Sequence, residues 1–211
     1  MSFEEAAVFR GAYSTAYHGL LQRGRLEKGD RVLIHGAAGA IGIPAIQIAK
    51  LFGAEVIATA STDEKRSACL AEGADHAIDY QAGFRDKVME LTGDRGVDII
   101  YDPVNDPTFE ESLRCLAWGG RILILGFLGG APALARTNYL LIKGTEAIGV
   151  RIGGLNEARP EIAAANTKAL LELAAQGKLK PRIWRRYPLS DAVEAVQALI
   201  DRKVIGKVVL V

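Results

Sequence analysis

The sequence predicts an α/β fold built on a doubly wound parallel sheet, and three observations carry this prediction. Apolar runs of strand length alternate with segments of helical period along most of the chain. Runs such as 97–101 and 121–125 are almost wholly apolar, as expected for parallel strands covered on both faces. A glycine-rich turn, 36–42, stands where the first strand ends and the next helix begins.

The elements follow one another in a regular order. Ser2 and Glu5 form a capping-box pattern, which predicts a helix over Phe3–Phe9 and a second over Ala12–Arg23. The predicted strands are Arg31–His35, Glu55–Ala60, Asp75–Ile78, Val97–Tyr101, Gly120–Leu125 and Ala147–Ile152. The predicted helices between them are the stretch with the apolar face Ile41, Ala45, Ile48, Ala49 and Phe52, then Asp63–Glu72, Phe84–Leu91, Thr108–Leu116 and Tyr139–Lys143.

The last section of the chain breaks this alternation. A long helix is expected over Glu161–Gln176 and an extended stretch over Pro181–Pro188. Ser190 is expected to cap a helix, and Gly206–Val211 to form a strand. The expected buried face of that helix is Ala192, Val193, Val196, Leu199 and Ile200. The sequence thus predicts a helical lead-in over 1–30, a dinucleotide-binding domain over 31–180 and a separate unit over 181–211.

Composition excludes several classes of protein. The 211 residues are 49% hydrophobic and 24% charged, the balance of a folded globular chain. Lys and Arg number 26 against 25 Asp and Glu, so a net charge of +1 argues against a nucleic-acid partner. No apolar run reaches the ~20 residues that a membrane span needs, and the start lacks the profile of a secretory signal. Cys69 and Cys115 have no metal-ligand spacing, so we expect no metal and a cytoplasmic location.

The glycine-rich turn carries the chemistry. His35-Gly36-Ala37-Ala38-Gly39-Ala40-Ile41-Gly42 lies between a strand and a helix, where free amides and the helix dipole converge on an anion. Gly39 is expected to let the backbone approach a pyrophosphate, and Gly42 to let helix and strand pack closely. Ala37 replaces the first glycine of the common pattern, and an ordinary tight turn is the alternative. Within a strand–helix–strand unit the pattern favours a Rossmann dinucleotide-binding domain.

The end of the second strand indicates which dinucleotide binds. NAD sites place an acidic residue there to bond the ribose hydroxyls, but residues 58–62 read Ala-Thr-Ala-Ser-Thr. Asp63 and Glu64 are expected to belong to the following helix start. Ser61 and Lys65 suit a 2′-phosphate, so we predict NADPH in preference to NADH. The alternative is that Lys65 is a solvated helix lysine.

These features together resemble the medium-chain dehydrogenase/reductase superfamily, and within it the zinc-independent NADPH:quinone oxidoreductases (zeta-crystallin-like), close to polyketide enoyl reductases. The resemblance covers essentially the whole chain. It rests on the order and spacing of these stretches: 13–17, 36–42, 73–80, 96–104, 119–127 and 206–209.

The resemblance implies cofactor contacts for a defined set of residues. They are Thr15, Val150, Arg151 and Ile152 near the nicotinamide, Ala38, Gly39, Ala40 and Ile41 at the pyrophosphate, Ser61, Lys65 and Tyr80 at the 2′-phosphate, Pro103, Val104, Gly126, Phe127 and Leu128 along the groove, and the C-terminal Lys207. The family's Gly-Gly after Pro-Val is replaced here by Asn105-Asp106, and Arg151 stands where an aromatic or small residue is usual. Both departures lie on the expected substrate side.

The resemblance also implies an activity and a larger assembly. The implied reaction is hydride transfer from the nicotinamide C4 of NADPH to a quinone or conjugated carbonyl, with no protein nucleophile and no assigned catalytic residue. The alternatives are an enoyl or enone reductase acting on acyl-CoA or polyketide substrates, and a non-catalytic NADPH-binding module. Family members begin with a GroES-like catalytic domain, and this chain begins where that domain ends. The C-terminal unit is expected to pack on that domain, and the edge strand at Thr145–Val150 is expected to join a homodimer.

Overall fold

A parallel sheet divides the molecule into layers, and the computed structural model describes all residues from Met1 to Val211. Six strands form this sheet: β1 (Arg31–Ile34), β2 (Glu55–Thr59), β3 (His76–Ile78), β4 (Val97–Asp102), β5 (Leu116–Ile124) and β6 (Glu146–Gly149). Their order is β3-β2-β1-β4-β5-β6, and every pair is parallel. This is the strand order of a doubly wound dinucleotide-binding sheet, so the predicted fold class is confirmed.

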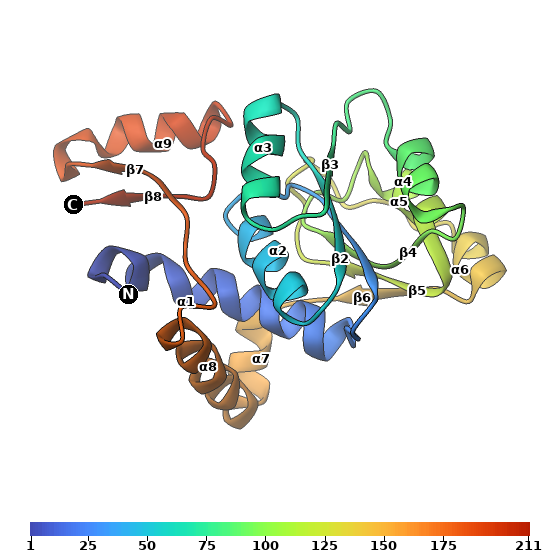
Figure 1. Cartoon of the computed structure of the whole chain (residues 1–211), viewed down its shortest axis with the longest axis horizontal. Coiled ribbons are helices and arrows are strands. Elements are labelled where there is room, and N and C mark those ends of the chain that lie inside the picture. Colours follow the sequence, from blue (N-terminus) through green and yellow to red (C-terminus); the bar gives the residue numbers. More distant parts are fainter.

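Helices cover both faces of the sheet (Figure 1). One face carries α1 (Phe3–Tyr17), the π-helix η1 (His18–Arg23), α2 (Gly42–Leu51), α3 (Asp63–Ala71) and α8 (Pro160–Ala175). The other carries α4 (Arg85–Thr92), α5 (Phe109–Cys115) and α6 (Thr137–Lys143). Val32 and Ile34 pack into the first core cluster and Leu33 into the second, because successive strand residues point to opposite faces.

The N-terminal segment forms one continuous helix where the sequence predicts two. The capping box is present, with Ser2 N–H donating to Glu5 Oε2 (2.8 Å) and Glu5 N–H to Ser2 Oγ (3.1 Å). Gly11 does not break the helix, since its position is open to solvent and its neighbours Phe9, Ala12 and Tyr13 are buried. Burial of that apolar stripe outweighs the roughly 1 kcal/mol that an interior glycine costs.

Two strand boundaries also differ from the prediction, and one helix was not predicted. Strand β5 starts at Leu116, before the predicted Gly120. Strand β6 ends at Gly149, and Ile152, predicted to be its last residue, instead begins an unpredicted helix, α7 (Ile152–Ala158). Gly153 and Gly154 give α7 a weak intrinsic helix preference, which hides it from a propensity argument.

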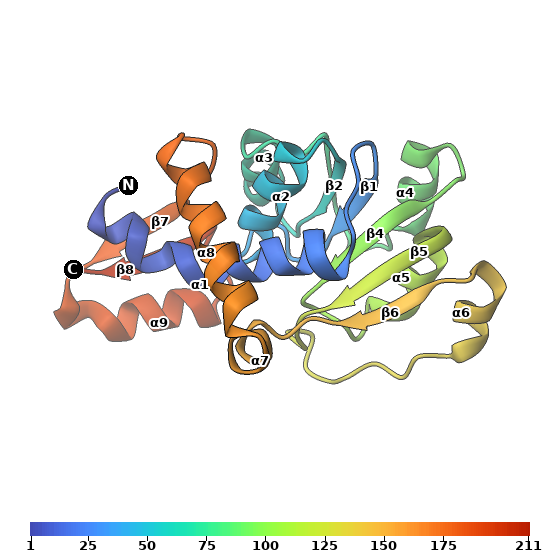
Figure 2. The same cartoon turned by 90° about the horizontal axis from the view of Figure 1, so that it is seen from below.

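The C-terminal segment forms a separate two-stranded parallel sheet at the end of the molecule remote from β6 (Figure 2). Its elements are β7 (Ile183–Tyr187), the 3₁₀ turn η2 (Leu189–Asp191), α9 (Ala192–Ile200) and β8 (Lys207–Leu210). Ser190 does not cap α9, because its hydroxyl donates to Asp191 Oδ1 and no side chain caps the helix.

The predicted buried face of α9 is wrong. Ala195 and Ala198 are the buried residues, because small side chains let the helix approach the sheet closely. Ala192 is half-buried, and Val193, Val196, Leu199 and Ile200 are between 50% and 82% exposed. An apolar stripe of α9 therefore faces outwards.

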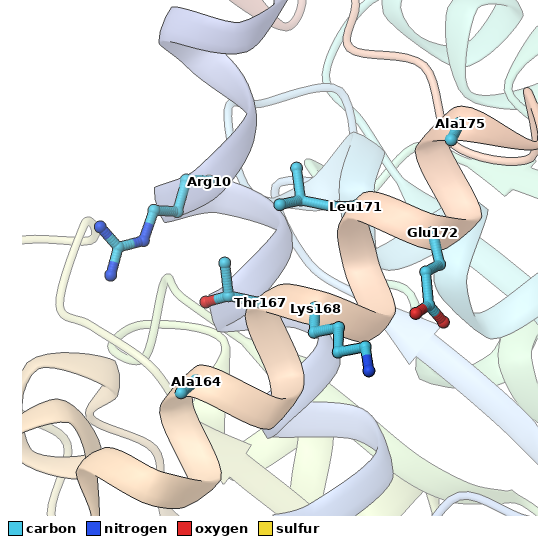
Figure 3. A pocket seen from close by; sticks show the side chains of 7 residues that line it. All are labelled: Arg10, Ala164, Thr167, Lys168, Leu171, Glu172 and Ala175. Atoms are coloured by element: carbon cyan, nitrogen blue, oxygen red, sulfur yellow. The ribbon is translucent and has the colours of Figure 1, made fainter.

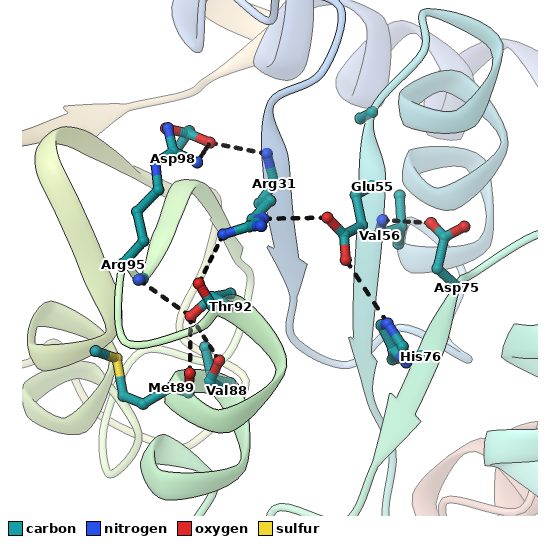
Figure 4. A network of polar contacts seen from close by, with 12 residues as sticks. Arg31, Glu55, Val56, Asp75, His76, Val88, Met89, Thr92, Arg95 and Asp98 are labelled. Atoms are coloured by element: carbon teal, nitrogen blue, oxygen red, sulfur yellow. Dashed lines mark hydrogen bonds and ion pairs between the residues drawn. The ribbon is translucent and has the colours of Figure 1, made fainter.

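A polar network ties the strands together at their amino ends (Figure 4). Arg31 N–H donates to Asp98 Oδ2 (2.9 Å), and Arg31 Nη1 donates to the carbonyl oxygen of Thr92 (2.8 Å). Arg31 Nε donates to Glu55 Oε2 (3.1 Å), and Glu55 lies 3.7 Å from His76. Asp98 therefore has a structural role, since its carboxylate accepts from Arg31 N–H and from Arg95. None of the helices combines the length and the apolar composition that a membrane span requires.

Candidate cofactor site at the carboxyl edge of the sheet

The glycine-rich turn lies between β1 and α2, at the point where the strand order reverses between β1 and β4. The amides of Ala38, Ala40, Ile41 and Gly42 donate no hydrogen bond within the protein. Four unpaired donors at the amino end of a helix form a cradle for an anion, because the helix dipole reinforces them. The turn therefore has the donor set that a pyrophosphate requires.

Glycine at position 42 is required by close packing. A Cβ there would lie 2.5 Å from the carbonyl oxygens of both Gly36 and Ala37, closer than real Cβ contacts allow. The turn is also held from the second strand, since Ala37 N–H donates to Thr59 O (3.2 Å). Gly42 thus lets the start of α2 pack closely on the turn that follows β1.

His35 lies beneath the turn as a packed residue. Its Nε2 lies 2.9 Å from Ser112 Oγ and its Nδ1 lies 3.1 Å from Thr59 Oγ1. The Ser112 hydroxyl donates to Thr108 O, which leaves its oxygen free to accept from the Nε2–H tautomer of His35. Complete burial lowers the pKa of His35 and keeps the ring neutral.

The end of β2 presents a cation and no carboxylate. Thr62 caps α3 by accepting from Lys65 N–H, and the carboxylate of Asp63 pairs with Arg66 (2.5 Å). The Lys65 ammonium donates to the carbonyl oxygen of Arg202 and forms no salt bridge. Burial, with the charge of Arg202 second, lowers the pKa of Lys65. A bound phosphate would relieve this repulsion.

The C-terminal segment completes this side of the site. Gly206 N–H donates to Ala38 O (2.8 Å), and the following Lys207 is half-buried, which lowers the pKa of its ammonium. Lys207 and Ala40 line one narrow cavity of about 10 Å³. Arg202 is the residue that sequence reasoning missed. It belongs to no motif, and only the tertiary fold brings it beside Lys65.

The loops after β4 and β5 form the other half of the edge. Leu128 N–H donates to Pro103 O (3.0 Å), and Gly129 N–H donates to Val104 O (2.9 Å). Asp102 Oδ1 accepts from Val104 N–H (2.9 Å), so this carboxylate holds the turn. The structure thus brings the predicted residues Pro103, Val104, Gly126, Phe127 and Leu128 into one pair of loops.

The remaining predicted residues are more scattered. Tyr80 follows β3 and packs against the second core cluster. Val150 is buried, whereas Arg151 is exposed and lies 3.9 Å from Glu157. The Thr15 hydroxyl donates to Gly11 O within α1 and forms no hydrogen bond to the glycine-rich turn. Ser61 is half-buried directly after β2 and forms no hydrogen bond through its side chain.

A larger groove of about 700 Å³ lies elsewhere, between α1 and α8 (Figure 3). Its charged lining residues do not converge, since Arg10 points away from Lys168 and Glu172. No group of three His, Cys, Asp or Glu side chains is placed to hold a metal ion. The carboxyl edge of the sheet is therefore the better candidate site.

Comparison with known proteins agrees with this geometry. Residues 40–168 match the family model described as zinc-binding dehydrogenase. The chain is 37% identical to the quinone oxidoreductase-like protein 2 homolog of Nematostella vectensis over 213 residues, which is 100% of this chain and 58% of the relative. The chain thus spans little more than half of that relative's length.

Solved structures give the same result at the level of the backbone. A mycobacterial protein complexed with NADPH superposes with a TM-score of 0.93 at 31% identity, covering 100% of this chain and 65% of the other. A quinone oxidoreductase of Pseudomonas syringae superposes with a TM-score of 0.87 at 30% identity, and the match covers 100% of this chain and 65% of the other. The CurK enoyl reductase superposes with a TM-score of 0.88 at 28% identity, and the match covers 100% of this chain and 64% of the other. The chain belongs to the quinone oxidoreductase family of the medium-chain dehydrogenase/reductase superfamily.

Proposed function

We propose that this chain is the NADPH-binding part of an oxidoreductase that reduces a quinone or another conjugated carbonyl compound. The observation that carries the proposal is that four unpartnered amides, those of Ala38, Ala40, Ile41 and Gly42, lie beside a strand end that holds no carboxylate and that carries Lys65, a cation without a salt bridge. NADP needs both features, because its pyrophosphate and its 2′-phosphate are separate anions.

Each half of the edge has its own task in this proposal. The turn 38–42 binds the pyrophosphate through the amides of Ala38, Ala40, Ile41 and Gly42. Ser61, Lys65 and Tyr80 surround the 2′-phosphate, together with Arg202. The loops 103–104 and 126–128 belong to the second mononucleotide half, over β4–β6, and so lie along the nicotinamide side. Thr15, Lys207 and 150–152 complete the proposed contacts. When bound, NADPH supplies the hydride, while the chain fixes its distance and face.

Titration of the protein with NADPH and NADH, followed by cofactor fluorescence, tests the cofactor assignment. We expect tighter binding of NADPH. Tighter binding of NADH would contradict the role of Lys65, and no binding of either would overturn the proposal.

Two further functions remain as alternatives to quinone reduction. An enoyl or enone reductase is favoured by the backbone similarity to the CurK enoyl reductase. Consumption of NADPH with 9,10-phenanthrenequinone and not with crotonyl-CoA supports the quinone reductase, and the reverse result supports the enoyl reductase. A chain that binds NADPH and reduces neither compound would support a non-catalytic module.

The exposed stripe of α9 supports a proposal about domain packing. Val193, Val196, Leu199 and Ile200 leave a continuous apolar surface beside a two-stranded sheet, which is marginal on its own. We assign the stripe to packing against a GroES-like catalytic domain, with 181–211 as the returning segment. A purified domain of that type, added in trans, is expected to protect α9 from amide exchange. Unchanged exchange would argue against this packing.

The free edge of β6 supports a homodimer. Glu146, Ala147 and Gly149 are exposed, and Trp118, Leu141 and Ile142 expose apolar surface nearby. Light scattering is expected to give the mass of a dimer, and Leu141→Glu to give a monomer. Leu134→Glu, at a 94% exposed loop position, is the control that keeps the dimer. A monomeric wild type would contradict this assembly.

The free, buried Cys69 and Cys115 support the proposed cytoplasmic location.

A further inference from the structure

Asn105 occupies a backbone conformation that few residues tolerate. Its φ is +66°, in the left-handed region that favours glycine and, among other residues, asparagine. Its N–H donates to Asp102 Oδ1 (2.8 Å), and its carbonyl accepts from Thr108 N–H (2.9 Å). Only 2% of its surface is exposed. The turn between β4 and α5 is therefore fixed at this residue.

The side chain of Asn105 reaches a second segment. Its Oδ1 accepts a hydrogen bond of 2.5 Å from the N–H of Ala133, in the long connection between β5 and α6. This is the one hydrogen bond that joins residues 131–135 to the rest of the protein. Ala133 also packs against the second core cluster, so the contact is both polar and apolar.

The same connection carries part of the proposed cofactor groove. Upstream of Ala133 it is held at Leu128 and Gly129 by their backbone bonds to Pro103 and Val104. A Cβ at Gly129 would lie 1.5 Å from Asp106 O, so the two loops run in direct backbone contact. Phe127 and Leu128, 50% and 70% exposed, project from the held segment.

We propose that Asn105 is a positioning residue: its amide fastens the segment 126–136 along the loop after β4 and thereby sets the affinity for the nicotinamide half of the dinucleotide. The inference rests on the proposed function. Glycine at this position keeps the backbone conformation but has no oxygen to accept from Ala133. Aspartate keeps the acceptor but places a second buried carboxylate beside Asp102, whose Oδ2 already lacks a partner. Asparagine therefore satisfies both demands.

The test compares Asn105→Gly with Asp94→Gly. Asp94 is a matched control, because it too has a positive φ (+60°), is exposed and forms no hydrogen bond through its side chain. Amide exchange of the ligand-free protein reports whether the hydrogen bond from Ala133 N–H to Asn105 Oδ1 is present. Titration with NADPH reports the whole cofactor site, and titration with adenosine 2′,5′-bisphosphate reports its adenosine half alone.

In Asn105→Gly we expect faster exchange of the Ala133 amide, the one hydrogen-bonded amide of residues 131–135, and about five-fold weaker NADPH binding, the size expected for one lost hydrogen bond. Binding of the bisphosphate should not change, and Asp94→Gly should change none of the three measurements.

Three results would overturn the proposal. Unchanged exchange at Ala133 would show that Asn105 does not hold this amide. Faster exchange with unchanged NADPH affinity would show that Asn105 does not position the cofactor site. Equal weakening of both ligands would indicate a general loss of structure instead. If the wild type does not bind NADPH, the proposed function fails, whereas the exchange experiment still decides whether Asn105 holds the segment.

Discussion

The amide of Gly206 donates a hydrogen bond of 2.8 Å to the carbonyl oxygen of Ala38, which fastens the C-terminal segment to the glycine-rich turn. This bond uses a carbonyl of the turn and leaves the amides of Ala38, Ala40, Ile41 and Gly42 free. The segment that brings Arg202 beside Lys65 is therefore fixed relative to the phosphate cradle.

Gly206→Ala is expected to loosen this attachment. Gly206 has a φ of +85°, and a Cβ there would lie 2.5 Å from Arg182 O. We expect a loss of about 1–3 kcal/mol in the free energy of unfolding and weaker NADPH binding, measured by urea denaturation and fluorescence titration. Gly177→Ala is the control, since its φ is +72° and nothing lies within 4 Å. Equal effects of both substitutions would show that backbone strain alone, and not the contact with Arg182, is responsible.

Gly42→Ala is expected to abolish tight NADPH binding. The new methyl group would collide with two carbonyl oxygens of the turn and push the amide cradle out of shape. Gly11→Ala is the opposite case, because its open helical position should gain about 0.5–1 kcal/mol of stability. Thermal denaturation and cofactor titration of both variants check the pair. An unaltered affinity in Gly42→Ala would contradict the anion-binding role of the turn.

Lys65→Ala is expected to weaken NADPH binding by about 10- to 100-fold, the range for a lost hydrogen bond to a charged group. NADH binding should hardly change, because NADH has no 2′-phosphate. Lys168→Ala, on the far helix α8, controls for the loss of one positive charge. Equal losses for NADPH and NADH would place Lys65 elsewhere than at the 2′-phosphate.

His35 is expected to make the protein less stable in mild acid. Burial lowers the pKa of His35 below its ordinary value of 6.5, so the unfolded chain takes up a proton that the folded chain refuses. The free energy of unfolding should therefore fall as the pH drops below about 6.5, by at most ~1.4 kcal/mol per pH unit from this group. Urea denaturation of wild type and His35→Asn between pH 7 and pH 5 should give a flatter profile for the variant. Parallel profiles would remove His35 as the cause.

Both cysteines are expected to be unreactive in the folded protein. Burial raises the pKa of Cys69 and of Cys115 to about 12, and only the thiolate reacts quickly. A thiol reagent at pH 8 should label neither residue until denaturant is added, and then both. Rapid labelling of the native protein would show that one of the two helices opens.

The sequence predicted most of the fold because the sheet is specified locally. Each central strand is a short apolar run, and Gly42 marks the turn by a packing need that acts on its immediate neighbours. The face of α9 was mispredicted for the opposite reason. That helix has two apolar stripes, and the partner sheet, not the pattern, decides that Ala195 and Ala198 are buried.

The candidate site was predicted in part. The turn 38–42 and Lys65 are visible because motif and position in the strand–helix unit point to the same chemistry. Arg202 and the contact between Asn105 and Ala133 arise only when segments distant in the chain meet. Neither hydrophobic periodicity nor residue propensity predicts contacts between such distant segments.

The amino-edge network has a consequence for how such a domain can diverge. Arg31 of β1 joins Glu55 of β2, Asp98 of β4 and the last residue of α4, Thr92, all at the edge away from the phosphate cradle (Figure 4). The register of the strands is thus fixed at their amino ends, whereas the proposed ligand contacts lie at their carboxyl ends. Substitutions in the loops at the carboxyl ends leave the contacts of Arg31 intact. One sheet can therefore acquire new substrates during evolution at little cost in stability.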